Sequence, residues 1–183
     1  MRFRSIPVVA SLAILLALAG CDASKSSTPP PARMTADAVG HNCQMYVLDH
    51  GGPKAQVHLK GADAPLWFAE VVDALAYLRG PEQEADVTAV YVSDMAKAAS
   101  WGEPGVDNWM RAKDAFYVVS SRRLGGMETP EAIPFSTREA ASAFVAESGG
   151  HVVRFDEIPN DYLKQQASMG DMDVRPAPIS HGG

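Results

Sequence analysis

Cysteine is scarce in this chain of 183 residues, which contains only Cys21 and Cys43. Two thiols cannot build the disulfide framework by which small secreted domains compensate for a limited hydrophobic core. Basic residues are also in the minority, because 16 lysines and arginines face 22 aspartates and glutamates, for a formal net charge of −6. A negatively charged chain is poorly suited to nucleic acid or to an anionic membrane face, so we expect neither as a partner.

Long apolar runs are absent except near the start, where residues 8–20 follow Arg2 and Arg4. This run is shorter than the roughly 20 residues that span a bilayer. Its length and its basic flank are typical of a secretory signal. We therefore predict a signal peptide over residues 1–20, and export from the cytoplasm.

The predicted signal ends in Leu18-Ala19-Gly20-Cys21, which resembles the bacterial lipoprotein box. The resemblance implies cleavage before Cys21 and lipidation of its thiol, which would anchor the chain to a membrane in the periplasm. Asp22 resembles the residue that retains lipoproteins at the inner membrane, although the outer membrane stays open. An ordinary signal peptide followed by a chance cysteine is the alternative.

Composition divides the mature chain into a tether, a folded body and a tail. Residues 21–40 are rich in serine, proline and alanine and lack an apolar period, so we predict a flexible lipidated tether. Residues 169–183 are polar and predict a mobile tail. Between them the apolar patterns follow the order strand, strand, helix, strand, twice. This order predicts an α+β fold of two similar ββαβ modules packed together, residues 41–95 and 96–168.

The first two strands of the first module are predicted to form a hairpin, because His50-Gly51-Gly52-Pro53 separates two β-rich runs. Asp63 is predicted to cap a helix that ends at Gly80. The apolar face of this helix comprises Phe68, Val71, Val72, Leu75 and Leu78 at three- and four-residue spacing. The strands of this module are expected at residues 43–49, 54–60 and 86–92.

The second module repeats this order. Ser136 and Glu139 have the spacing of a capping box for a helix over residues 137–148, and Gly149-Gly150 ends it. The strands are expected at residues 115–121, 132–136 and 151–155, and a further short helix at residues 160–168.

Lipidation of Cys21 would leave Cys43 without an intramolecular disulfide partner in an oxidising compartment. Such a thiol could be a buried structural residue, since free cysteine often behaves as a small hydrophobe. It could also be the nucleophile of an envelope thiol enzyme, with His41 as its base. No cysteine-hydrolase signature surrounds it, however, and no Cys-x-x-Cys motif is present.

The third role open to Cys43 is that of a metal ligand. Residues i and i+2 of a strand point to the same face, so a strand over residues 43–49 would place Cys43 and Met45 on one side. A thiolate and a thioether are soft ligands, and soft ligands select Cu(I). Zinc would require four nitrogen or sulfur ligands, and no such set is visible.

Several features together resemble the nitrous oxide reductase accessory lipoprotein family, of NosL type. They are the lipoprotein box, the tether, the tripeptide Cys43-Gln44-Met45 and the stretch from Trp101 to Phe135. In that stretch, as in the family signature, a tryptophan-containing loop leads to a strand, a glycine-rich turn with Met127 and a Pro-Phe strand. The resemblance covers most of residues 41–155 and depends on the order of the motifs.

This resemblance implies a periplasmic carrier of Cu(I) that is not an enzyme. The carrier would serve maturation of the copper–sulfide centre of nitrous oxide reductase, in denitrification, beside a membrane maturation and transport complex. The family's copper ligands map onto Cys43 and Met45, with Met127 as a further ligand. Two chains could also share one ion, which would give a copper-bridged homodimer.

The chain departs from the family pattern at three positions. Gln44 replaces a glycine that is common in the family, and Glu128 follows the turn methionine where many members have histidine. His41 stands in the upstream region where many members have another cysteine. The third copper ligand is therefore expected to be either Met127 or His41.

Overall fold

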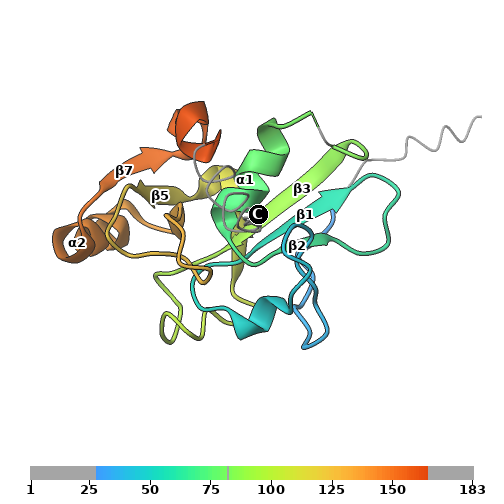
Figure 1. The fold of residues 1–183 in the computed structure, drawn as a ribbon, viewed down its shortest axis with the longest axis horizontal. Helices are drawn as coiled ribbons and strands as arrows, with labels where there is room; N and C mark the ends of the chain where they lie inside the picture. Colours follow the sequence, from blue (N-terminus) through green and yellow to red (C-terminus); the bar gives the residue numbers. More distant parts are fainter. Residues whose placement is uncertain (1–27, 82, 165–183) are drawn as a thin grey trace, which may run out of the picture.

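The computed structural model describes residues 28–81 and 83–164. Within these ranges the chain forms two antiparallel sheets with helices α1 and α2 (Figure 1). The strands are β1 (Ala55–Leu59), β2 (Leu66–Phe68), β3 (Val87–Ser93), β4 (Trp109–Arg111), β5 (Phe116–Val119), β6 (Ile133–Phe135) and β7 (His151–Arg154). The helices are α1 (Val71–Arg79) and α2 (Arg138–Ser148), and the short 3₁₀ helices are η1 (Val47–Asp49), η2 (Ala112–Asp114) and η3 (Phe155–Glu157).

The two sheets share one topology. Their strand orders are β2-β1-β3-β4 and β6-β5-β7, so β1 and β5 occupy equivalent central positions. Along the chain, β1-β2-α1-β3 is followed by β5-β6-α2-β7. The predicted α+β fold with two ββαβ units is therefore confirmed. Strand β4 was not predicted because three residues are too few to show a period, and it extends the first sheet beyond residue 95.

Helix α1 lies between the two sheets (Figure 1) and joins both in one continuous core. The side chains of strand β5 point alternately to the two faces of the second sheet. Tyr117 and Val119 belong to the core around α1, whereas Phe116 and Val118 pack in a second cluster with α2. Both faces of the second sheet are therefore covered. The shared core fixes the segment that leads into α1, to which the two turns of the candidate site are hydrogen-bonded.

Two predictions in the first module are wrong. Residues 43–49 are not a strand, because the chain turns there and then enters η1. The helix does not begin at Asp63, because β2 takes residues 66–68 and pairs with β1, so α1 begins at Val71. Gly61, with φ of 81°, lies in the turn between β1 and β2. Phe68 thus belongs to a strand, while the helix end at Gly80 is confirmed.

The second module matches its prediction more closely, since β5, β6, α2 and β7 all lie within the expected ranges. The cap differs by one residue, because the Thr137 side chain, not that of Ser136, accepts a hydrogen bond from the Ala140 N–H at 3.2 Å. Gly149, with φ of 73°, ends the helix as expected. Residues 160–164 are helical, and the rest of the predicted short helix lies outside the described residues.

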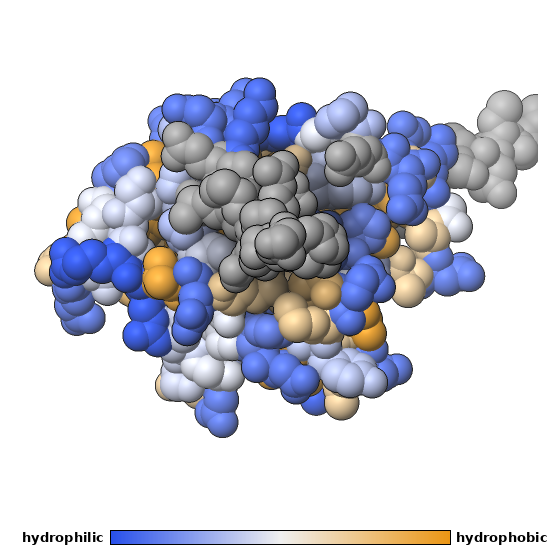
Figure 2. Space-filling model, viewed as in Figure 1, coloured by the Kyte–Doolittle hydropathy of each residue, from blue (hydrophilic) through white to orange (hydrophobic). Residues whose placement is uncertain are grey.

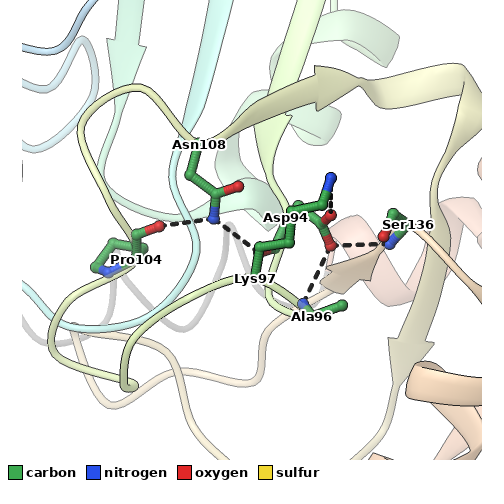
Figure 3. Close-up of polar contacts among 6 residues, drawn as sticks. All are labelled: Asp94, Ala96, Lys97, Pro104, Asn108 and Ser136. Atoms are coloured by element: carbon green, nitrogen blue, oxygen red, sulfur yellow. Dashed lines mark hydrogen bonds and ion pairs between the residues drawn. The ribbon is translucent and has the colours of Figure 1, made fainter.

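Asp94, which follows β3, connects the two halves of the molecule (Figure 3). Its buried carboxylate accepts hydrogen bonds from the N–H groups of Ala96 at 3.1 Å and Ser136 at 3.0 Å, and lies 3.1 Å from the Lys97 ammonium. The Asn108 side chain donates to the Asp94 carbonyl at 2.8 Å. Burial raises the pKa of the Asp94 carboxyl group. The hydrogen bonds from Ser136, Lys97 and Ala96 outweigh the effect of burial and leave this pKa below its ordinary value.

The later part of the predicted tether, residues 28–40, packs on the folded body. Gln56 both accepts from the Ala32 N–H at 2.7 Å and donates to the Ala32 carbonyl at 3.0 Å. The Tyr91 hydroxyl donates to the Pro29 carbonyl at 2.5 Å, and Met34 is 1% exposed. The body therefore begins before residue 41. Composition could not show this, because the segment is held by hydrogen bonds to its backbone and not by an apolar period.

The predictions for the signal peptide, Cys21, Asp22 and residues 169–183 concern residues that lie outside the described ranges. In the part of the chain that the structure does describe, no helix is long and apolar enough to cross a membrane. The coloured part of the face in Figure 2 is mainly hydrophilic, with hydrophobic residues in small separate groups.

Candidate metal centre

Cys43 and Met45 lie in a tight turn that residues 40–45 form at the surface. The Gly40 N–H donates to the Met45 carbonyl at 2.9 Å, and the Gln44 N–H donates to the Gly40 carbonyl at 3.0 Å. Gln44 has φ of 56°, in the left-handed region that favours glycine. Strand alternation therefore does not determine how Cys43 and Met45 are oriented, and this part of the sequence argument is wrong.

The Cys43 thiol is free and half-buried. Its sulfur occupies the space in which a side chain on Gly40 would lie, beside the backbone nitrogen of Ala69. Cys43 packs against a small apolar cluster that includes Ala69 and Met34. Met45 is 43% exposed. The turn thus presents one thiol that is backed by the protein and one thioether that faces solvent.

His41 belongs to the same turn but packs as an aromatic residue. Its ring lies 5.6 Å from the ring of Phe68 and 5.4 Å from the ring of Tyr77, measured between centroids. Its N–H donates to the Trp67 carbonyl at 2.7 Å. These contacts hold the His41 ring against the base of the turn.

Met127 is half-buried in a second turn, residues 124–130, which is held by Glu70. The Met127 N–H donates to Oε1 of Glu70 at 2.9 Å, and the Thr129 hydroxyl donates to Oε2 at 2.6 Å. The Gly125 N–H closes the turn on the Thr129 carbonyl at 2.7 Å. The backbone of Met127 is therefore held by Glu70.

Both turns contact the segment of residues 67–70, which leads from β2 into α1. Cys43 packs against the cluster that contains Ala69, and Met127 is hydrogen-bonded to Glu70. The His41 N–H of the Cys43 turn also donates to the Trp67 carbonyl. The Cys43 turn and the Met127 turn are therefore both hydrogen-bonded to the segment of residues 67–70, although they are about 80 positions apart in the sequence.

His50, which the sequence analysis did not select, lies against the Met127 turn. Its Nδ1 is 3.4 Å from the Gly126 carbonyl oxygen. A side chain on Gly126 would collide with the Gly51 carbonyl and with His50 itself. Side chains on Gly51 and Gly52 would press on Trp101. These glycines therefore serve a close approach to the Trp101 loop and not the predicted hairpin turn.

Three buried charged residues support this region, and none of them was predicted. Lys54, Glu70 and Glu131 are each at most 1% exposed. The Lys54 ammonium donates to the Gly51 carbonyl at 2.8 Å and to the Ala69 carbonyl at 2.9 Å. Burial lowers the pKa of Lys54 to about 8, although the charges of Glu131, Glu70 and Cys43 act in the opposite direction.

Glu131 fixes the start of α1 from the other side of this charged group. Its carboxylate accepts hydrogen bonds from the N–H groups of Val71 at 3.0 Å, Val72 at 2.8 Å and its neighbour Ala132 at 2.7 Å. Burial, followed by the charge of Glu70, raises the pKa of Glu131 well above its ordinary value. Two of the free N–H groups at the beginning of α1, those of Val71 and Val72, are thereby satisfied.

The available donors determine which metals the site could hold. Among the described residues, no three His, Cys, Asp or Glu side chains gather as metal ligands do. The two turns offer sulfur instead, in the Cys43 thiol and the thioethers of Met45 and Met127. Thiolate and thioether groups are soft donors, which prefer soft ions such as Cu(I).

Comparison with known proteins identifies the family. The profile of the NosL family matches residues 31–163. The chain is 49% identical over 158 residues to the copper-binding lipoprotein NosL of Achromobacter cycloclastes, which covers 86% of this chain and 80% of that relative. It is 33% identical over 164 residues to the copper-binding lipoprotein NosL of Stutzerimonas stutzeri, which covers 86% of this chain and 83% of that relative.

The fold is similar to that of a solved relative. The crystal structure of the copper chaperone NosL from Shewanella denitrificans superposes with a TM-score of 0.67 and 30% identity, and covers 73% of this chain and 99% of that chain. The sequence profile, the two relatives and the fold agree with one another, so the chain belongs to the NosL family.

Proposed function

We propose that this protein is a lipid-anchored metallochaperone that carries Cu(I) in the periplasm. Cys43 supplies a thiolate ligand, and Met45 and Met127 supply thioether ligands. The observation that carries the proposal is that the Cys43 turn and the Met127 turn are both hydrogen-bonded to residues 67–70, through the N–H groups of His41 and Met127. The relatives named above are copper-binding lipoproteins and a copper chaperone, which supports copper as the cargo.

The exposure of the site supports transfer of the ion over storage. Cys43 and Met127 are half-buried and Met45 is exposed, so a partner could reach the ligands without unfolding of the domain. Sulfur donors support the Cu(I) state, since thiolate and thioether prefer the softer ion. Binding must displace the thiol proton of Cys43, so the affinity for Cu(I) is expected to fall as the solution becomes more acidic.

The recipient that we propose is nitrous oxide reductase, whose copper–sulfide centre would be assembled with the help of a membrane maturation and transport complex. The motifs shared with the accessory lipoproteins of that enzyme support this assignment. Acyl chains on Cys21 would hold the protein at the membrane surface, and Asp22 favours the inner membrane. The proposed role is delivery, so no reaction is assigned to the protein itself.

Anaerobic titration of the mature lipidated chain in detergent, in competition with a chromophoric Cu(I) chelator, tests the function. We expect one Cu(I) per chain. Cys43→Ala should abolish tight binding, and Met45→Leu and Met127→Leu should each weaken it. His41→Phe is the matched control, because it keeps an aromatic ring against Phe68 and Tyr77 and should leave the affinity unchanged.

Other outcomes would point elsewhere. Equal affinity of the Cys43→Ala variant and the parent would contradict the proposed function. Rapid stoichiometric alkylation of Cys43, unaffected by Met45→Leu and accompanied by no copper binding, would favour the envelope thiol enzyme. A mass of two chains with one ion would identify a copper-bridged homodimer.

A further inference from the structure

Glu70 is a buried carboxylate whose two oxygens are both used by the Met127 turn. It is 1% exposed, at the N-terminal boundary of α1. A buried carboxylate is costly unless it is hydrogen-bonded. Its partners here are the Met127 N–H at 2.9 Å and the Thr129 hydroxyl at 2.6 Å, which lie 57 and 59 residues further along the chain. Both carboxylate oxygens of Glu70 therefore accept hydrogen bonds from the Met127 turn, and neither accepts one from α1.

The turn is shaped to receive this carboxylate. A side chain on Gly125 would collide with Oε1 of Glu70 and lie 3.4 Å from the Thr129 carbonyl oxygen. Gly125 is buried, so the turn backbone approaches Glu70 directly. Gly126 meets the Gly51 backbone in the same close manner. The Met127 turn is consequently clamped between Glu70 and the loop that contains Gly51.

Lys54 ties these two clamping elements to each other. Its ammonium binds the Gly51 carbonyl and the Ala69 carbonyl, and Ala69 directly precedes Glu70. Ala69 also belongs to the apolar cluster against which Cys43 packs, and the His41 N–H of the Cys43 turn donates to the Trp67 carbonyl. Residues 67–70 therefore connect the Cys43 turn to the Met127 turn.

From this arrangement we infer that Glu70 is a positioning residue for copper binding, which holds Met127 at the Cys43 turn before the ion arrives. The inference rests on the proposed function and deepens it. Glu70 does not touch the ion; it acts through the backbone of the Met127 turn. Without it, Met127 would have to be ordered each time an ion bound, and that ordering would weaken binding.

A double-mutant cycle separates positioning from simple stability. Glu70→Ala, Met127→Leu and the double variant are made in the mature lipidated chain, and Cu(I) affinity is measured by chelator competition. Loss of a residue that orients a metal ligand typically costs about tenfold or more in metal affinity. We expect Glu70→Ala to lower the affinity by about this factor, and Met127→Leu to have almost no further effect in the Glu70→Ala background.

Two controls make the cycle specific. Met45→Leu should keep its full effect in the Glu70→Ala background, because Met45 belongs to the other turn. Glu131→Gln perturbs an equally buried carboxylate that binds the start of α1 and not the Met127 turn, so Met127→Leu should keep its full effect there. X-ray absorption at the copper edge should show one sulfur ligand fewer in Glu70→Ala than in the parent.

The outcomes distinguish this inference from the proposed function. If Met127→Leu costs the same factor in the Glu70→Ala background as in the parent, or costs nothing in the parent, the positioning role is overturned while Cys43-dependent binding stands. If Cys43→Ala binds Cu(I) as the parent does, the proposed function itself fails. Should Glu70→Ala not fold, Thr129→Val removes one of the two contacts and should show the same coupling with Met127 at smaller amplitude.

Discussion

At the scale of single residues, Gln44 shows how one backbone angle overturns a pattern. The alternation argument required an extended chain through residues 43–49, but φ of 56° at Gln44 closes a turn instead. The Gln44 side chain supports this conformation by donating to the His41 carbonyl at 2.7 Å. The resemblance noted in the sequence includes a glycine at this position in many members, and a left-handed φ is the physical reason to prefer glycine there.

The stability of variants at position 44 should depend on how well the new residue tolerates a positive φ. Gln44→Gly is expected to change the free energy of unfolding by less than about 1 kcal/mol, because relief of strain offsets the lost hydrogen bond. Gln44→Val should destabilise by about 2 kcal/mol, since a β-branched residue is a clear outlier in this region. Urea denaturation of the two variants measures the difference, and equal stability would contradict the assigned backbone conformation.

At the scale of elements, the sequence predicted helices better than the segments between them. Gly149 ends α2 with a positive φ, and Gly80 at the end of α1 directly precedes Pro81, so both helix ends can be read without tertiary information. Strand β2 could not be separated from α1, because Phe68 continues the apolar spacing of the helix. An edge strand of three residues exists only because β1 is available to pair with it.

The same distinction applies to the candidate site. Cys43, Met45 and Met127 could be selected from the sequence because thiol and thioether chemistry is visible in single residues. Glu70 and Lys54 could not be selected, because their roles depend on burial and on contacts such as the one between Glu70 and Thr129, 59 residues apart. Nothing in a charged residue's local sequence reveals that its partners will be backbone groups of a distant turn.

Helix α1 carries a charge that opposes folding at neutral pH. Burial, followed by the neighbouring charge of Glu70, raises the pKa of Asp73 to about 6. Between the ordinary value near 4 and this raised value, the folded protein binds more protons than the unfolded chain. The contribution of Asp73 to stability therefore decreases as the pH rises through this interval and stays unfavourable above it.

Asp73→Asn should remove this unfavourable contribution. We expect the free energy of unfolding to increase by roughly 2 kcal/mol at pH 7, and the gain over the parent to disappear near pH 4. Urea denaturation at the two pH values measures it. Asp63→Asn, at an exposed position before β2, is the control and should change little at either pH. A gain that is independent of pH would contradict the titration of Asp73.

At the scale of the whole molecule, the two ββαβ units form one core. Residues of β1, α1 and β5 belong to the same apolar cluster, and Asp94 adds a buried polar connection between β3 and the start of α2. A repeat in topology therefore does not imply two independent domains here. The halves share buried surface that neither could cover alone.

Asp94→Ala tests this connection. The loss leaves the N–H groups of Ala96 and Ser136 without their acceptor, which should cost about 2–3 kcal/mol in the free energy of unfolding. Lys97→Met, which removes only the largely exposed partner of Asp94, should cost less than about 1 kcal/mol. Because the apolar core is shared, tryptophan fluorescence and circular dichroism should still report a single unfolding transition. Separate transitions would show that the halves unfold independently.

The docking of residues 29–34 on the first sheet would limit how far the folded body can lie from a lipid anchor. Hydrogen bonds from Tyr91 and Gln56 hold this segment, so if Cys21 is acylated as proposed, only the seven residues 22–28 separate it from the docked chain. Seven residues span at most about 25 Å when fully extended. The folded body would then stay in a thin layer of the envelope, within roughly one protein diameter of the lipid headgroups. Any copper donor or acceptor would have to enter that layer to bind it.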